Sequence, residues 1–501
     1  SGSVLMSQPS GLLVFIEPPV KDPRHIPERF AGCSYMLYPL PDLANFYMLS
    51  YFKKHGLESE IVNAVLDRLS EAEFLHRIRD LRPRALILHS VVLAKPVDLA
   101  CLPKLLQAVD APVLIHGPEP SRVPQEYLDA AGRLAHNERV LVFTGEPENN
   151  MLRYLLHGEK KGVHLYEGEE KKYYPHGHDF LSIEDLPFDF HEHPTVKRLS
   201  RHFLNAKFPR QPVAAMLASR GCPFPCSYCV PNSVSFAREL EFRQTAGHGK
   251  KPRAVYAGPE RVIAEFQAVK AAGYPSLMVM DDQFLASKKR TLAICEGVKD
   301  LGLDWGCLSR PDFLDDEEVV AALARAGCIS VDIGIETLSQ RLLDLIDKQL
   351  DLQTFYRAVP LLQKYKIEPK INIMFGSSAE ETEADIRHTL RELKRLKVRH
   401  VMFAVATPFK GTPFYDQAKQ NGTLIDDADS INPFGKSMVS YPNLSHERLQ
   451  QLTRQAYRRF YLRPSQMWYR LQSYRSWDSL RNDLRVLVHL LWRDQTRRAA
   501  R

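Results

Sequence analysis

The sequence predicts an α/β protein: a doubly wound, Rossmann-like domain, then a partial (β/α)6 barrel of the TIM type, then a helical C-terminal region. Two observations predict the first two parts. Short apolar stretches alternate with amphipathic helical stretches up to about residue 155, and again between residues 212 and 435. Such alternation is typical of parallel sheets covered by helices. From about residue 436 the apolar period becomes helical, which predicts the third part.

The composition sets outer limits. The chain has 501 residues, 44% of them apolar, which allows two to four domains with sizeable cores. No apolar run is long enough for a membrane-spanning helix, and the N-terminus shows no secretory signal pattern. The eight cysteines are too sparse for a disulfide scaffold. These features favour a cytoplasmic protein, and the net charge of +7 is only a mild bias.

Residues 1–155 are expected to form the first domain. Between its strands lie helical stretches such as Leu43–His55, Glu71–Asp80 and Val97–Val109. Ligands of doubly wound sheets bind at the carboxyl ends of the strands. The predicted strands are Leu12–Glu17, Glu60–Val65, Ala85–Ser90, Pro112–Gly117 and Val140–Gly145.

Residues 156–211 differ from both neighbours. Lysines and glutamates crowd a predicted hairpin between residues 160 and 171, and Pro187 lies in turn-rich sequence beyond it. This composition predicts a surface linker between two domains.

Residues 212–435 are expected to form the barrel, whose chemistry would lie at the carboxyl ends of its strands. Helices such as Glu260–Ala272, Asp316–Ala326 and Glu383–Leu396 separate these strands. The predicted strands are Ala214–Ser219, Ser276–Asp281, Trp305–Arg310, Ser330–Glu336, Lys370–Gly376 and His400–Pro408.

Three of the eight cysteines, Cys222, Cys226 and Cys229, lie on the loop that follows the first barrel strand. Thiolates at this spacing can reach one compact cluster, and three of them leave one iron of a four-iron, four-sulfur cluster open. A zinc site would need a fourth ligand at suitable spacing, and His202 and His248 are poorly placed. Other cysteines, such as Cys295, Cys307 and Cys328, lie in apolar contexts that favour packing.

The cysteine loop, with Tyr228 before its last cysteine, resembles that of the radical S-adenosylmethionine (SAM) superfamily over roughly residues 212–420. Three later segments also resemble this superfamily, two of them its cobalamin-dependent subgroup. Where relatives usually carry a proline, this chain has Gly376–Glu381 instead. The three segments are Asp281–Phe284, Gly334–Glu336 and Pro408–Pro413.

The resemblance implies roles for residues at strand ends. Tyr228 would place an aromatic face near adenine, and Glu336 would accept hydrogen bonds from ribose hydroxyls. Arg310 would hold a substrate or cofactor carboxylate through its guanidinium donors. Asp281 and Asp282 end the second strand beside the same site. An ordinary ion pair at the barrel end is the competing interpretation of Arg310 and Asp281.

The first domain resembles the cobalamin-binding domain of the same subgroup. Ser90, Gly117, Gly145 and Glu146 end successive strands and would line the pocket for the nucleotide tail, although glycines there also make strand–helix turns. The usual Asp-x-His-x-x-Gly motif is missing, so we expect no histidine on cobalt. A transfer-RNA methylthiotransferase would need three further N-terminal cysteines and a β-rich C-terminal domain, which this sequence lacks.

Residues 451–501 hold twelve arginines, three aspartates, no lysine and no glutamate, interleaved with Trp468, Trp477 and Trp492. A solvated or domain-packing helix is the first interpretation, a membrane-surface helix the second, and a nucleic-acid surface the third. Residues 458–464 resemble the tail of cobalamin-dependent radical enzymes of lipid and tetrapyrrole pathways. This similarity predicts an apolar small-molecule substrate and peripheral contact with the inner membrane surface.

The resemblance implies a cobalamin-dependent radical SAM methyltransferase that acts on an unactivated carbon. Its cofactors would be the [4Fe–4S] cluster, SAM and cobalamin, with an external electron donor such as flavodoxin or ferredoxin. The alternative is a cobalamin-dependent cyclase or rearrangement enzyme without methyl transfer. A non-enzymatic sensor is disfavoured, because a sensor has no need of a ribose-binding strand end. The sequence identifies no residue that donates or quenches a radical.

Overall fold

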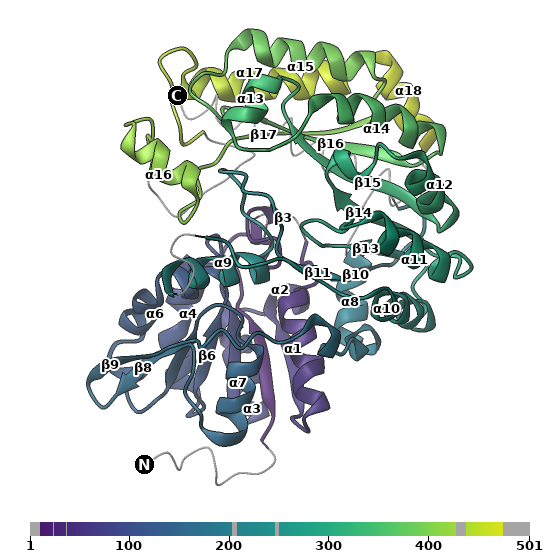
Figure 1. The fold of residues 1–501 in the computed structure, drawn as a ribbon. Helices are drawn as coiled ribbons and strands as arrows, with labels where there is room; N and C mark the ends of the chain where they lie inside the picture. The colour runs from purple at the N-terminus through teal and green to yellow at the C-terminus, as the bar shows by residue number, and fades with distance from the viewer. Residues whose placement is uncertain are drawn as a thin grey trace.

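The structure is a computed structural model that describes residues 11–23, 25–36, 38–202, 208–245, 250–426 and 437–473. It contains two bodies built on parallel sheets, one above the other in Figure 1, with the C-terminal helices lying over the upper body. The predicted α/β class and the two-sheet architecture are confirmed.

The N-terminal sheet has five parallel strands in the order β4, β1, β5, β6, β7. This order, in which β4, the second strand of this sheet along the chain, lies outside β1, is that of flavodoxin-like doubly wound folds. Each predicted strand is present to within about two residues. The strands are β4 (Ser59–Asn63), β1 (Leu13–Glu17), β5 (Ala85–His89), β6 (Val113–His116) and β7 (Val140–Phe143).

Helices cover both faces of this sheet, because successive strand residues point to opposite sides. Phe15 and Ile87 face α1 (Leu43–Lys54) and α7 (Glu148–His157) in one apolar core. Val14 and Leu86 belong to a second core with the opposite helices. Those helices are α3 (Glu71–Leu81), α4 (Lys95–Ala108) and α6 (Pro124–Ala131).

Part of the predicted linker belongs to the N-terminal sheet. The hairpin of β8 (Val163–Glu167) and β9 (Glu170–Tyr174) is present, but β8 pairs antiparallel with β7 and extends the sheet. The apolar faces of Val163 and Leu165 are fully buried, and the charged residues lie on the outer strand. The high charge of the hairpin concealed this sheet pairing. Farther along, α8 (Pro194–His202) packs its apolar side into the main core.

The second sheet has six parallel strands in chain order, an open barrel that confirms the (β/α)6 prediction. Its strands are β10 (Val213–Met216), β13 (Ser276–Val279), β14 (Asp304–Ser309), β15 (Cys328–Glu336), β16 (Glu368–Phe375) and β17 (His400–Val405). Its main helices are α10 (Pro259–Ala271), α11 (Lys288–Val298), α12 (Glu317–Arg325), α14 (Leu352–Lys364) and α15 (Glu383–Arg395).

The C-terminal helices α17 (His446–Tyr461) and α18 (Pro464–Ser473) lie along the outer edge of β17. The hydroxyl of Tyr461 accepts a hydrogen bond from the N–H of Val401 (3.0 Å) and donates one to the carbonyl of Val401 (2.6 Å). The described part of the arginine-rich tail lies in these two helices, of which α17 packs on the barrel domain, whereas Trp468 on α18 is 64% exposed. Trp477 and Trp492 lie outside the described residues. No helix among the described ranges is long and apolar enough to cross a membrane.

Candidate functional site

The cysteine loop joins the short strand β11 (Ser219–Arg220) to α9 (Ser233–Thr245) at the carboxyl end of the barrel. Backbone hydrogen bonds hold it from two sides. The N–H of Ser227 donates to the carbonyl of Ile346 (3.1 Å), and the carbonyl of Ser227 accepts from the N–H of Phe414 (3.0 Å). The loop is therefore anchored to segments that follow the fourth and sixth barrel strands.

The three thiols of the loop lie close enough to influence one another electrostatically. Burial raises the pKa of Cys222 to about 11 and that of Cys229 well above its ordinary value. Lys251 opposes this shift at both cysteines; its Nζ donates to the carbonyl of Phe224 (3.2 Å). Thiols in such a setting stay protonated at neutral pH unless a metal displaces the proton. Three unpaired cysteines on one loop fit an iron–sulfur cluster with one open iron.

Tyr228, Glu336 and Lys348 meet next to this loop. Lys348 Nζ donates to the Tyr228 hydroxyl (2.8 Å) and lies 3.2 Å from Glu336 Oε1. Glu336 adopts φ +70° at a register shift of β15, and such backbone outliers cluster at functional sites. A Cβ at Gly334 would lie 2.9 Å from Glu336 Oε1, so glycine leaves room for this carboxylate. The structure thus brings together two predicted residues and a lysine that the sequence analysis missed.

Arg310 lies just after β14, and its guanidinium is engaged within the fold. It donates to the carbonyls of Lys348 (2.6 Å) and Gln349 (2.7 Å), and it pairs with Asp312 (3.0 Å). Its guanidinium carbon lies 3.5 Å from the centre of the Phe224 ring in the cysteine loop. Arg310 therefore connects the segment at Lys348 and Gln349 to the cysteine loop. This structural role is closer to the ion-pair interpretation than to the binding of a ligand carboxylate.

Asp281 and Asp282 follow β13; Asp281 is fully buried and Asp282 is partly buried. Asp281 accepts a hydrogen bond from the N–H of Ala218 (2.6 Å), and Asp282 accepts one from the N–H of Asn232 (2.7 Å). Burial raises the pKa of Asp281 to about 7 and that of Asp282 to about 6. Asp281 fastens the end of β10, and Asp282 fastens the end of the cysteine loop.

In the N-terminal sheet, Ser90 and Gly117 lie side by side at the ends of β5 and β6. The Ser90 hydroxyl is buried and hydrogen bonded with Asp98 (2.6 Å) and Tyr127 (2.7 Å). Gly117 has φ +120°, and a Cβ there would lie 2.3 Å from the Ser90 carbonyl oxygen. Gly117 is therefore required by the turn, as the alternative interpretation of these glycines holds.

Gly145 and Glu146, at the end of β7, lie at the seam between the two bodies. The buried carboxylate of Glu146 is 3.3 Å from Arg220 and 3.0 Å from Arg238, both in the barrel domain. Arg220 also pairs with Glu148 (2.5 Å). A residue predicted to line a ligand pocket thus forms a buried ion pair between domains. Arg220, adjacent to the cysteine motif, gave no sign of this partner in the sequence.

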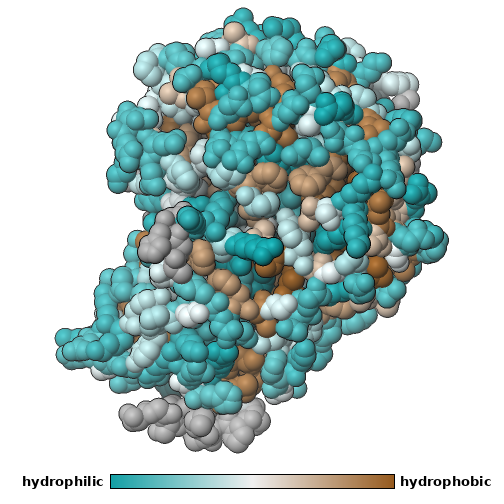
Figure 2. All heavy atoms as spheres, in the orientation of Figure 1, coloured by the Kyte–Doolittle hydropathy of each residue, from teal (hydrophilic) through white to brown (hydrophobic). Residues whose placement is uncertain are grey.

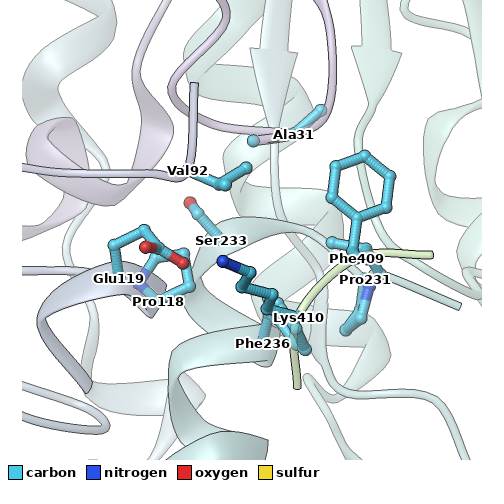
Figure 3. A pocket seen from close by; sticks show the side chains of 11 residues that line it. Ala31, Val92, Pro118, Glu119, Pro231, Ser233, Phe236, Phe409 and Lys410 are labelled. Carbon is cyan, nitrogen blue, oxygen red and sulfur yellow. The ribbon is translucent and has the colours of Figure 1, made fainter. Parts of the chain in front are cut away.

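A small pocket lies between the two bodies (Figure 3). Its walls come from N-terminal residues such as Ala31, Val92 and Pro118, and from the barrel domain through Val230 and Phe409. The Lys410 ammonium and the Glu119 carboxylate point into the same region in Figure 3. Among the described residues no histidine lines it. Figure 2 shows apolar side chains along the seam between the bodies, within a largely hydrophilic face.

Comparison with known proteins assigns the barrel domain. Residues 216–393 match the family model of the Radical SAM superfamily. This match confirms the predicted resemblance of the barrel domain to that superfamily.

Curated relatives match about half of this chain and about half of their own length. An uncharacterized methyltransferase of Pyrococcus horikoshii is 30% identical over 50% of this chain and 52% of its own. Bacteriochlorophyllide d C-12(1)-methyltransferase of Chlorobaculum tepidum is 27% identical over 42% and 44%, respectively. An anaerobic magnesium-protoporphyrin IX monomethyl ester cyclase of Rubrivivax gelatinosus is 25% identical over 50% and 42%.

Two solved structures share the fold across both bodies. The radical SAM methyltransferase TsrM of Kitasatospora setae has a TM-score of 0.60 at 16% identity, covering 90% of this chain and 83% of its own. The cobalamin-dependent radical SAM enzyme OxsB has a TM-score of 0.59 at 14% identity, covering 90% and 61%. The likeness extends beyond the barrel to the N-terminal sheet.

Proposed function

We propose that this chain is a cobalamin-dependent radical SAM methyltransferase that transfers a methyl group to an unactivated carbon of an apolar small molecule, such as a lipid or a tetrapyrrole. The interdomain pocket carries the proposal. Its lining combines the residues that follow Cys229 with the strand-end loops of the N-terminal sheet. A substrate there would touch both domains. The matched bacteriochlorophyllide methyltransferase supports a tetrapyrrole-like substrate.

Residues 212–435 would hold the cluster and SAM. Cys222, Cys226 and Cys229 are the cluster ligands, and Glu336 and Lys348 would orient SAM at the open iron through hydrogen bonds to its polar groups. Tyr228, fixed by Lys348, would face the adenine. When bound, the cluster supplies the electron that splits SAM, and the surrounding residues exclude water.

Residues 1–155 would bind cobalamin, which supplies the methyl group. The lining of the pocket is mostly apolar and includes no histidine among the described residues, and such a lining would fit the face of a corrin ring. The pocket is much smaller than that cofactor, so we expect the lining loops to separate when it binds. Ser90 and Gly117 remain candidates for the tail pocket. Residues 451–501 would provide any contact with a membrane surface.

The test uses anaerobically reconstituted protein with cobalamin, labelled SAM, and reduced flavodoxin or ferredoxin. With a tetrapyrrole or lipid substrate, 5′-deoxyadenosine and S-adenosylhomocysteine should appear in similar amounts, and label from the SAM methyl group should enter the product. The matched cyclase supports the second candidate, ring closure without methyl transfer. Substrate-dependent 5′-deoxyadenosine with no S-adenosylhomocysteine and no transferred label would exclude methylation.

A further inference from the structure

Three metal-ligating side chains gather at the seam between the two bodies, outside the cysteine loop. His176 and His178 lie on the segment after β9, and Glu241 lies on α9. One ligand atom from each residue lies within 4.8 Å of the others. His176 and Glu241 are buried, whereas the His178 side chain is 24% exposed, so solvent reaches one side of the cluster.

The hydrogen bonds of His176 determine which ring nitrogen is available. Its Nε2 lies 2.9 Å from the backbone carbonyl of Glu146, and a carbonyl can only accept, so Nε2 carries the proton. Its Nδ1 therefore carries the ring lone pair, which accepts a hydrogen bond from the backbone N–H of His178 (3.2 Å), and a bound metal ion would replace this hydrogen bond. A histidine that binds a metal typically donates its other ring N–H to a carbonyl or a carboxylate in this way.

The other two side chains are also oriented toward a shared centre. His178 Nε2 lies 2.9 Å from Glu241 Oε2, and the Thr245 hydroxyl donates to Glu241 Oε1 at 2.7 Å. Ligating carboxylates are commonly held by such an outer hydrogen bond. Space is reserved around the imidazole of His176, because a Cβ at Gly145 or Gly162 would lie 3.1 Å or 2.9 Å from its ring.

We infer that His176, His178 and Glu241 bind one Zn²⁺, with water in the fourth position on the exposed side. Two imidazoles and one carboxylate form a recurrent zinc ligand set, with bond lengths of about 2.0–2.2 Å. The ion would link the segment after β9, which belongs to the N-terminal sheet, to α9 of the barrel domain. It would therefore strengthen the seam on which the interdomain pocket is built, independently of the reaction that the enzyme catalyses.

The test is metal analysis of full-length, cluster-reconstituted protein after exposure to Zn²⁺ and desalting. Wild-type protein should retain about one zinc per chain, with only nitrogen and oxygen neighbours in zinc K-edge X-ray absorption. The triple variant Cys222→Ala, Cys226→Ala, Cys229→Ala should retain the zinc, because the site uses no sulfur. His178→Ala and Glu241→Gln should each retain less than about a tenth of it.

His164→Ala is the matched control, since His164 stacks on Tyr173 in the β8–β9 hairpin and lies outside the cluster. It should keep the wild-type zinc content. Glu241→Gln preserves the size of the side chain, so it reports on the site even where His178→Ala fails to fold. Absence of zinc from the wild type, sulfur neighbours, loss of zinc in the triple cysteine variant, or full retention in Glu241→Gln would overturn the inference.

Discussion

The carboxyl ends of the two parallel sheets occupy the same position in their folds but are used differently. At the barrel, the cysteine loop, Glu336 and Lys348 converge from three segments on one place. At the N-terminal sheet, Ser90 is bonded to Asp98 and Tyr127, and Glu146 is paired across the seam. A strand end marks where a site can form, but the partners of its polar atoms decide whether a ligand or the fold itself uses them.

The largest effect is expected at the carboxyl end of the barrel, where cluster assembly and SAM cleavage depend on the three thiols. Cys226→Ala removes one of three cluster ligands, so the visible absorbance of the reconstituted cluster and the cleavage of SAM should fall to background. Iron content, absorbance and 5′-deoxyadenosine formation measure this. Cys295→Ala, a buried helix position outside the loop, should keep all three properties. If Cys226→Ala cleaved SAM at the wild-type rate, the carboxyl end of the barrel would not be the cluster site, and the difference between the two sheet ends would be lost.

Substitution of Glu146, at the seam beside the N-terminal sheet, should lower the stability of the protein and leave ligand binding unchanged. Glu146→Ala leaves Arg220 and Arg238 buried with fewer carboxylate partners, so the free energy of unfolding should fall by about 3–5 kcal/mol. Urea denaturation measures this. Glu71→Ala, which breaks the exposed pair with Lys104, should cost about 1 kcal/mol or less. If Glu146→Ala instead weakened corrinoid binding at unchanged stability, Glu146 would bind the ligand and would not act mainly as an ion-pair partner between the domains.

The smallest of these effects concerns Lys348. Lys348→Met removes the donor shared by Tyr228 and Glu336, so SAM should bind about 10–100-fold more weakly, as expected for a hydrogen bond to a charged group worth about 1.5–3 kcal/mol. Equilibrium dialysis with reconstituted protein measures the affinity. Lys394→Met, an exposed position on α15, serves as the control. Unchanged SAM affinity would confine Lys348 to a structural role like that of Arg310.

Most of the fold could be predicted, because each strand of a parallel sheet is covered by helices and shows a short apolar run. The exception is the place of the β8–β9 hairpin, which was predicted as part of a surface linker but extends the N-terminal sheet; only Val163 and Leu165 are fully buried in it, and charged residues dominate its sequence. β8 pairs with β7 because β7 would otherwise be an unpaired edge strand of the sheet. The sequence of the hairpin itself does not indicate that such an edge is available.

The site was predictable where spacing alone constrains chemistry. Three cysteines within eight residues must lie together, whatever the fold. Lys348 contacts Tyr228 across 120 residues, and its segment contains only a lysine among apolar, acidic and amide neighbours. Glu146 and Arg220 were likewise separated by 74 positions, so their pairing depends on how the domains dock. The burial of Lys348 is visible only in the structure, so the sequence offered no signal for its role.

The tyrosines of α17 also bear on how the molecule avoids self-association. An open sheet ends in a strand whose backbone groups could pair with a strand of another chain. Here Tyr457 accepts from the N–H of Phe403 (3.2 Å), and Tyr461 binds both backbone groups of Val401. Two phenol hydroxyls thus take the place of a neighbouring strand. A chain shortened before His446 would present this edge uncovered, as a template for intermolecular β-pairing.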